Sequence, residues 1–93
     1  MRVKLWYYAM AREAAGSRDE AVTLPEGATV LKLVQTLIEL HPAFKGYVYD
    51  EEGRLLDYLM FSVNDVDVLG LDGFDTVLRD GDTVRVMPPL GGG

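Results

Sequence analysis

The last residues of the chain are the ones whose types and spacing could do chemistry. The sequence ends in Pro88-Pro89-Leu90-Gly91-Gly92-Gly93, directly after a strand-like stretch. The two prolines keep the backbone extended and stiff, and the glycines remove the side chains from the final positions. Four extended residues reach about 13–14 Å at roughly 3.3–3.6 Å each. Such a tail could thread a narrow tunnel and present its carboxylate to a partner protein, the alternative being a frayed terminus or a cloning remnant.

A terminal carboxylate is ionised at pH 7, because the α-carboxyl pKa is near 3.5, and it is a poor electrophile. It needs activation, for instance as an acyl adenylate, before a nucleophile can attack it, and the reactive residue would be Gly93. The rest of the chain offers little comparable chemistry. It has no cysteine, and its single histidine, His41, is expected to cap a helix rather than bind metal. We therefore predict no metal site and no active site within the chain itself.

Length and composition narrow the class of protein further. The 93 residues suffice for one domain, and 48% of them are apolar, which excludes a fully disordered chain. A net charge of −6 disfavours nucleic acid as a partner and favours a basic protein. No long apolar run or signal peptide is evident, so we expect a cytoplasmic protein that does not contact a membrane.

Periodicity predicts the elements that must position the tail. Alternation of apolar and polar residues predicts strands over residues 2–10, 20–24, 60–64 and 83–87. Val30, Leu33, Val34 and Leu37 recur at helical spacing in a helix that Thr29 begins and His41-Pro42 ends. A short helical turn is expected over residues 11–16, and a loop over residues 65–75.

The order strand, strand, helix, strand, strand predicts an α+β chain with the β-grasp topology. In this fold a mixed sheet of four to five strands packs on one main helix. We expect residues 1–90 to form that domain and residues 91–93 to be a flexible glycine tail.

The outward face of the predicted sheet is a second candidate site. In a β-grasp sheet the first and last strands are neighbours, so outward-pointing residues of both strands should meet. Aromatic residues, methionine and arginine are enriched at protein interfaces. We therefore predict a partner interface beside the tail, although scattered exposed apolar residues are also ordinary. Its members are Trp6, Tyr8, Met60, Arg85 and Met87.

Four motifs in order resemble the MoaD/ThiS group of ubiquitin-like sulfur carriers, most closely the small subunit of molybdopterin synthase. Residues 8–16 are similar to that family's aromatic-Ala-x-x-Arg-Glu-x-x-Gly opening, and Val63-Asn64 to its third-strand Val-Asn. Residues 80–84 resemble its Asp-Gly-Asp-x-Val turn. Residues 87–92 resemble its aromatic-Pro-Pro-hydrophobic-x-Gly-Gly ending.

The resemblance implies a carrier, not a catalyst. An E1-like adenylyltransferase would use ATP to adenylate the terminal glycine, a sulfur donor protein would convert it to a thiocarboxylate, and the large synthase subunit would pass the sulfur to a pterin precursor. The chain itself would bind no cofactor. Pro88 and Pro89 would set the exit angle, and Leu90, Gly91 and Gly92 would line the partner's tunnel.

Two alternatives stay open. The family usually ends in two glycines and this chain in three, so either Gly93 or Gly92 is the reactive end. The second alternative is a protein modifier, in which a lysine amine attacks the activated glycine and forms an isopeptide bond. The two readings share their chemistry up to the adenylate, so the sequence barely separates them.

Overall fold

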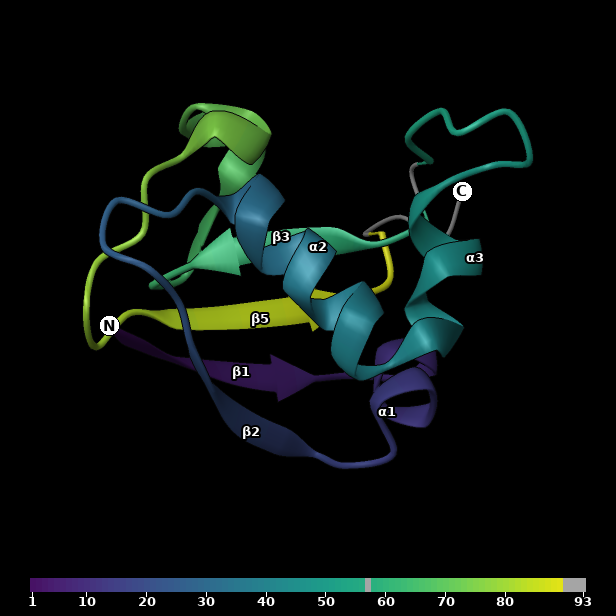
Figure 1. The fold of residues 1–93 in the computed structure, drawn as a ribbon, viewed down its shortest axis with the longest axis horizontal. Coiled ribbons are helices and arrows are strands. Elements are labelled where there is room, and N and C mark those ends of the chain that lie inside the picture. Colours follow the sequence, from purple (N-terminus) through teal and green to yellow (C-terminus); the bar gives the residue numbers. More distant parts are fainter. Residues whose placement is uncertain (57, 90–93) are drawn as a thin grey trace.

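Within the described residues, 1–56 and 58–89, the computed structural model is a mixed five-stranded sheet whose main helix crosses one face (Figure 1). The strands are β1 (Arg2–Tyr7), β2 (Asp19–Thr23), β3 (Met60–Val63), β4 (Val66–Asp67) and β5 (Thr83–Met87). The helices are α1 (Met10–Ala15), α2 (Val30–Leu40) and α3 (Lys45–Val48), and the 3-10 turns are η1 (Pro42–Phe44), η2 (Val68–Gly70) and η3 (Gly73–Asp75).

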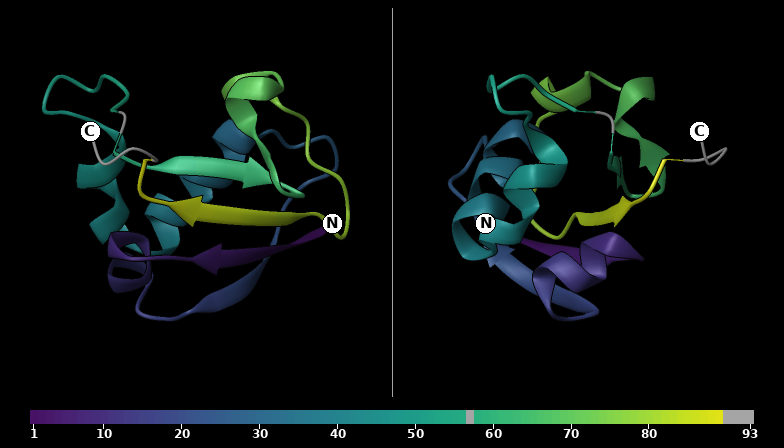
Figure 2. Two further views of the ribbon diagram at one scale, coloured as in Figure 1. Left: turned by 180° about the vertical axis from the view of Figure 1, so that it is seen from behind. Right: turned by 90° about the vertical axis from the view of Figure 1, so that its right-hand side faces the viewer.

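The strand order β2-β1-β5-β3-β4 confirms the predicted β-grasp topology. β1 and β2 form an antiparallel pair, β1 and β5 run parallel, and β3 pairs antiparallel with β5. The first and last strands of the chain therefore lie side by side at the centre of the sheet, as Figure 2 shows from behind.

The core forms where the inward residues of the sheet meet α2. Val3, Leu5 and Tyr7 of β1 are buried, and so are Val84 and Val86 of β5. Opposite them α2 buries the predicted stripe of Val30, Leu33, Val34 and Leu37. The Thr29 side chain begins this helix by accepting a hydrogen bond from the backbone N–H of Lys32 at 3.4 Å, as predicted.

Two expectations about the elements are wrong. The first strand ends at Tyr7 and not at residue 10, because Ala9 adopts φ 52° and turns the chain into α1. Residues 65–75 are not a plain loop, since they contain the edge strand β4 and the turns η2 and η3. The predicted helical turn is present, and Gly16 ends it in the left-handed conformation (φ 73°) that glycine adopts without strain.

A partly buried polar cluster joins β2 to the end of α2. The Tyr7 hydroxyl donates to Glu20 Oε2 at 2.6 Å, and His41 Nε2 lies 2.5 Å from the same oxygen. His41 is the C-cap residue of α2, as predicted, but the cap is made by its backbone N–H, which donates to the Leu37 carbonyl at 2.7 Å, and not by its side chain. The His41 side chain does something else: it ties α2 to β2. Burial, followed by the bond to Glu20, raises the pKa of Tyr7 well above its ordinary value.

The buried stripe of α2 predicts a large difference between two leucines of one helix. Leu33 is fully buried, whereas Leu40 is 52% exposed. We expect Leu33→Ala to lower the free energy of unfolding by about 2–5 kcal/mol, because it leaves a cavity in the core. Leu40→Ala should change it by less than about 0.5 kcal/mol. Urea unfolding followed by circular dichroism measures both, and equal costs would contradict this account of the core.

The Tyr7 cluster predicts a loss of stability in alkali. Since the pKa of Tyr7 is higher in the folded chain than its ordinary value of 10.0, the stabilisation is complete below that pH and is lost as pH rises above it. We expect the unfolding free energy to fall by about 1.4 kcal/mol per pH unit above 10 through this group. Tyr7→Phe should remove that component while leaving other titrations unchanged. Urea unfolding of both chains at about pH 8 and about pH 11 tests this, and parallel losses would rule it out.

Candidate functional site

The chain leaves the sheet at the end of β5, a strand with neighbours on both sides. β5 pairs with β1 on one side and with β3 on the other, and it ends at Met87. Pro88 is half-buried and Pro89 is exposed, so the chain leaves the sheet where the sequence predicted. Leu90, Gly91, Gly92 and Gly93 lie outside the described residues, and the predictions for them stay predictions.

All five residues predicted for the outward patch lie together on the face opposite α2. Trp6 of β1 is the register partner of Arg85 of β5, and Met60 of β3 is the partner of Met87. Tyr8 continues β1, with its backbone N–H donating to the Val86 carbonyl at 3.0 Å. Each of the five is half-buried. We call this set the outer patch; seen from behind, its strands lie in front of the helices (Figure 2).

Arg85 holds the centre of the outer patch in place. Its Nε donates to the Tyr8 hydroxyl at 3.2 Å, and its Nη1 donates to Asp65 Oδ1 at 2.7 Å. The guanidinium thus links β1, β5 and the turn between β3 and β4. A planar group held at two points loses little further freedom when a partner covers it. Asp65 was missed by the sequence prediction, because it belongs to a turn whose direction no periodicity reports.

Two further cations flank the outer patch at Trp6. Lys4 Nζ lies 5.5 Å from the Trp6 ring centroid, and the Arg18 guanidinium lies 5.3 Å from it. Both cations also reach Asp19, at 2.8 Å and 3.1 Å. The hydrogen bond from Lys4, and then that from Arg18, lowers the pKa of Asp19. The alternation of β1 could have revealed Lys4, but Arg18 precedes β2 in a turn and gave no such signal.

Ala9 turns the chain between the outer patch and α1 in an unusual conformation. Its φ of 52° and ψ of −126° fall in a region that residues with a side chain rarely adopt. The carbonyls of Tyr8 and Ala9 accept from the backbone N–H groups of Ala11 and Arg12, both at 3.0 Å. Because of this strained turn, Tyr8 remains on the outer face of the sheet and α1 begins directly after Ala9.

The described residues hold neither a candidate metal-binding cluster nor a helix that could span a membrane. Residues 1–56 and 58–89 contain no cluster of three or more His, Asp or Glu side chains that could hold a metal ion. No helix in the same part of the chain has the length and apolarity needed to cross a membrane. The site is thus an exit segment and the outer patch beside it.

Comparison with known families identifies the class of protein. The ThiS family matches residues 5–93, which is nearly the whole chain. The chain belongs to the ThiS family. The family resemblance inferred from the four motifs is therefore confirmed.

Relatives of this ThiS-family chain carry two kinds of name. It is 32% identical over 93 residues to the molybdopterin synthase sulfur carrier subunit of Chlamydomonas reinhardtii, with all of both chains covered. It is 31% identical over 93 residues to small archaeal modifier protein 3 of Haloferax volcanii, again with all of both chains covered. The crystal structure of SAMP1 from Haloferax volcanii superposes with a TM-score of 0.84, at 27% identity and full coverage of both chains.

The strained turn of this ThiS-family chain predicts a stabilising substitution. Ala9 is exposed, so glycine would remove little contact there, and glycine adopts positive φ freely. We expect Ala9→Gly to raise the unfolding free energy by about 0.5–1 kcal/mol. The matched control is Ala21→Gly, at an exposed position of β2 with negative φ, which should lower it by about 0.5–1 kcal/mol. Urea unfolding of the three chains measures the difference, and two changes of the same sign would argue against strain at Ala9.

Proposed function

We propose that the chain is the sulfur carrier of a molybdopterin synthase. Its terminal glycine is adenylated and then converted to a thiocarboxylate, whose sulfur passes to a pterin precursor in the large subunit of the synthase. The family and the relative named as a sulfur carrier subunit support this proposal. The chain acts as co-substrate, and the catalytic groups belong to its partners.

The observation that carries the proposal is the way the chain leaves the sheet at the end of β5. A central strand, paired on both sides, ends at Met87, and Pro88 and Pro89 then lead out of the domain beside the outer patch. Beyond Pro89 the sequence contains one leucine and three glycines. A folded domain would therefore deliver a segment of mostly glycine residues, which have no side chains, as entry into a narrow active site requires.

The chemistry follows from the weak electrophilicity of a carboxylate. An oxygen of the Gly93 carboxylate attacks the α-phosphorus of ATP in an E1-like adenylyltransferase, and pyrophosphate leaves. The terminal sulfur of a persulfide on the donor protein then displaces AMP. A thiol cleaves the resulting S–S bond, is itself oxidised to a disulfide, and leaves the thiocarboxylate on the chain. In the synthase the thiocarboxylate sulfur attacks the pterin precursor, and water then hydrolyses the resulting thioester. The sulfur stays on the pterin, and the water oxygen regenerates the terminal carboxylate.

The outer patch is the surface that we assign to the partners of this cycle. It adjoins the exit at Met87 and combines aromatic, methionine and arginine side chains, which recur at interfaces. Arg85 is already ordered by Tyr8 and Asp65, so a partner that covers it immobilises little. The activating enzyme and the large subunit must both receive the same tail, so each has to approach the domain at this surface.

A second candidate function is protein modification. A lysine amine of a target protein would attack the adenylated glycine and release AMP, forming an isopeptide bond. The relative named small archaeal modifier protein 3 favours this candidate, because its identity to the chain is almost the same as that of the carrier subunit. The two roles are compatible in one chain, since both begin with the adenylate.

Intact mass spectrometry separates the two functions. The full chain is incubated with ATP, its E1-like enzyme, a persulfide donor and a thiol. We expect the mass gain that accompanies replacement of one oxygen by one sulfur, and fragmentation should locate it on Gly93. Peptides joining Gly93 to a lysine, with no thiocarboxylate, would instead make the modifier the main function.

A chain lacking Gly93 is the matched control for the reactive end. Removing one residue moves the carboxylate back by about 3.5 Å, enough to misplace a reacting group. We therefore expect at least about a hundredfold slower adenylation. Adenylation at the rate of the full chain would assign the native reactive end to Gly92.

A further inference from the structure

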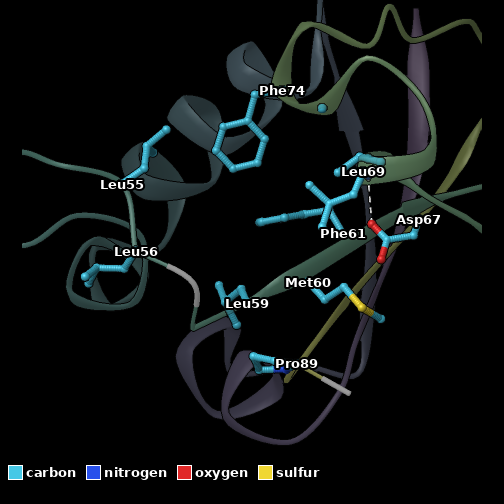
Figure 3. A pocket seen from close by; sticks show the side chains of 11 residues that line it. Leu55, Leu56, Leu59, Met60, Phe61, Asp67, Leu69, Phe74 and Pro89 are labelled. Carbon is cyan, nitrogen blue, oxygen red and sulfur yellow. Dashed lines mark hydrogen bonds between the residues drawn. The ribbon is translucent and has the colours of Figure 1, made fainter. Parts of the chain in front are cut away.

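An apolar groove opens at the edge of the sheet beside the exit of the chain. It has a volume of about 650 Å³ and lies between the segment before β3 and the turns η2 and η3 (Figure 3). Leu55 and Leu59 line one side, and Leu69 and Phe74 line the other, with Phe61 between them. The groove exists because β4 covers only the end of β3, pairing with Ser62 and Val63 and leaving Met60 and Phe61 beyond it.

The groove exposes more apolar surface than folding requires. Leu69 is 84% exposed and Leu55 is 53% exposed, although both line the same cavity. A single exposed leucine is ordinary, but exposed leucines facing one another across an apolar cavity mark a binding surface. The cavity volume suits one or two large apolar side chains.

The groove also lies in the most acidic part of the chain. Residues 50–75 hold eight of the fifteen acidic residues and one of the nine basic residues, so their net charge is −7 and that of the rest of the chain is +1. These residues supply every lining residue except Pro89. Asp67 is itself in the lining, where its Oδ1 accepts from the Leu69 N–H at 2.9 Å (Figure 3). An occupant of the groove should therefore carry positive charge around its apolar part.

The groove is continuous with the proposed site. Pro89, the residue from which the tail departs, lines it, and Met60 belongs to both the groove and the outer patch. A protein that accepts the tail must therefore lie over or beside the groove. A second copy of the chain would bring two acidic surfaces together, and the chain's own terminal carboxylate would meet Asp67, so both are disfavoured as occupants.

We propose that the groove docks an apolar side chain, flanked by lysine or arginine, of the enzyme that adenylates the tail. The inference rests on the proposed function. The activating enzyme is the partner that both the carrier and the modifier require, because both begin with the adenylate. The groove then contributes affinity before chemistry and holds the domain while the tail enters the active site.

The test compares two pairs of exposed residues. Leu55→Ser/Leu69→Ser changes the groove, and Leu40→Ser/Val77→Ser is the control, because Leu40 and Val77 are 52% and 57% exposed and do not line the groove. ATP–pyrophosphate exchange is measured with the E1-like adenylyltransferase of the same organism. We expect the KM for the carrier to rise on the order of tenfold or more in the groove variant with kcat unchanged, because binding common to ground and transition states is lost. The control should stay within about twofold.

A second variant tests the charge. Asp72→Lys/Asp75→Lys reverses two exposed carboxylates beside Phe74 without touching an apolar lining residue. We expect it to raise KM and to weaken the dependence of KM on salt, since a basic partner would meet fewer opposite charges. Circular dichroism and thermal unfolding of each variant show whether it is folded before its kinetics are compared.

The outcomes distinguish the two proposals. If the wild-type chain is adenylated and the groove variant has the same KM, the docking role is wrong and the proposed function stands. If the wild-type chain is not adenylated at all, the proposed function fails and the docking role with it. A dimer that the groove variant abolishes, with KM unaffected, would place a second copy in the groove and overturn the proposal.

Discussion

The parallel pairing of β1 with β5 is the contact on which the rest of the structure depends. It joins the first strand of the chain to the last, with Leu5 beside Val84 and Trp6 beside Arg85. On the inner face the pair supplies fully buried residues to the core. On the outer face the same register brings Trp6 and Tyr8 next to Arg85. Because β5 has hydrogen-bonded neighbours on both sides, the point at which the chain leaves the domain is fixed by a well-supported strand of the sheet.

The two faces of the sheet have separate roles, and this separation explains how so small a domain can serve as a carrier. α2 and the inward residues form one continuous core, which stabilises the body. The outer face does not form part of this core. Its charges are paired within the chain: Arg85 with Asp65, and Lys4 and Arg18 with Asp19. These pairs order long side chains before a partner arrives.

Two surfaces of different character meet at the exit of the chain. The outer patch is aromatic and flanked by cations, whereas the groove is apolar, has one carboxylate in its lining, Asp67, and belongs to the most acidic part of the sequence. Met60 and Pro89 lie where the two surfaces adjoin. The net charge of the whole chain does not reveal this difference between the two surfaces, since the excess of negative charge belongs to residues 50–75. Under the proposed function, a partner that receives the tail would therefore meet two surfaces of different chemistry, one aromatic and one apolar.

The order of amino acids was enough to predict the existence of four strands, β1, β2, β3 and β5, but not the edge strand β4. It also predicted the stripe of α2, its Thr29 cap, the end at His41-Pro42 and the exit at Pro88-Pro89. Each of these is local, because a period of two or 3.6 residues reports which face a side chain takes, and proline acts on its own backbone. Membership of the outer patch was also predictable once the fold was known.

The tertiary structure alone decided which distant groups meet those faces. No local pattern reports that Glu20 lies between Tyr7 and His41, that Arg18 covers Trp6, or that Asp65 holds Arg85. The turn at Ala9 ended β1 early against its alternation, because the start of α1 required it. The groove also depends on tertiary contacts that no local pattern reports. Its walls come from segments before and after β3, and the space between them depends on how far β4 extends along β3, which is a property of packing and not of sequence periodicity.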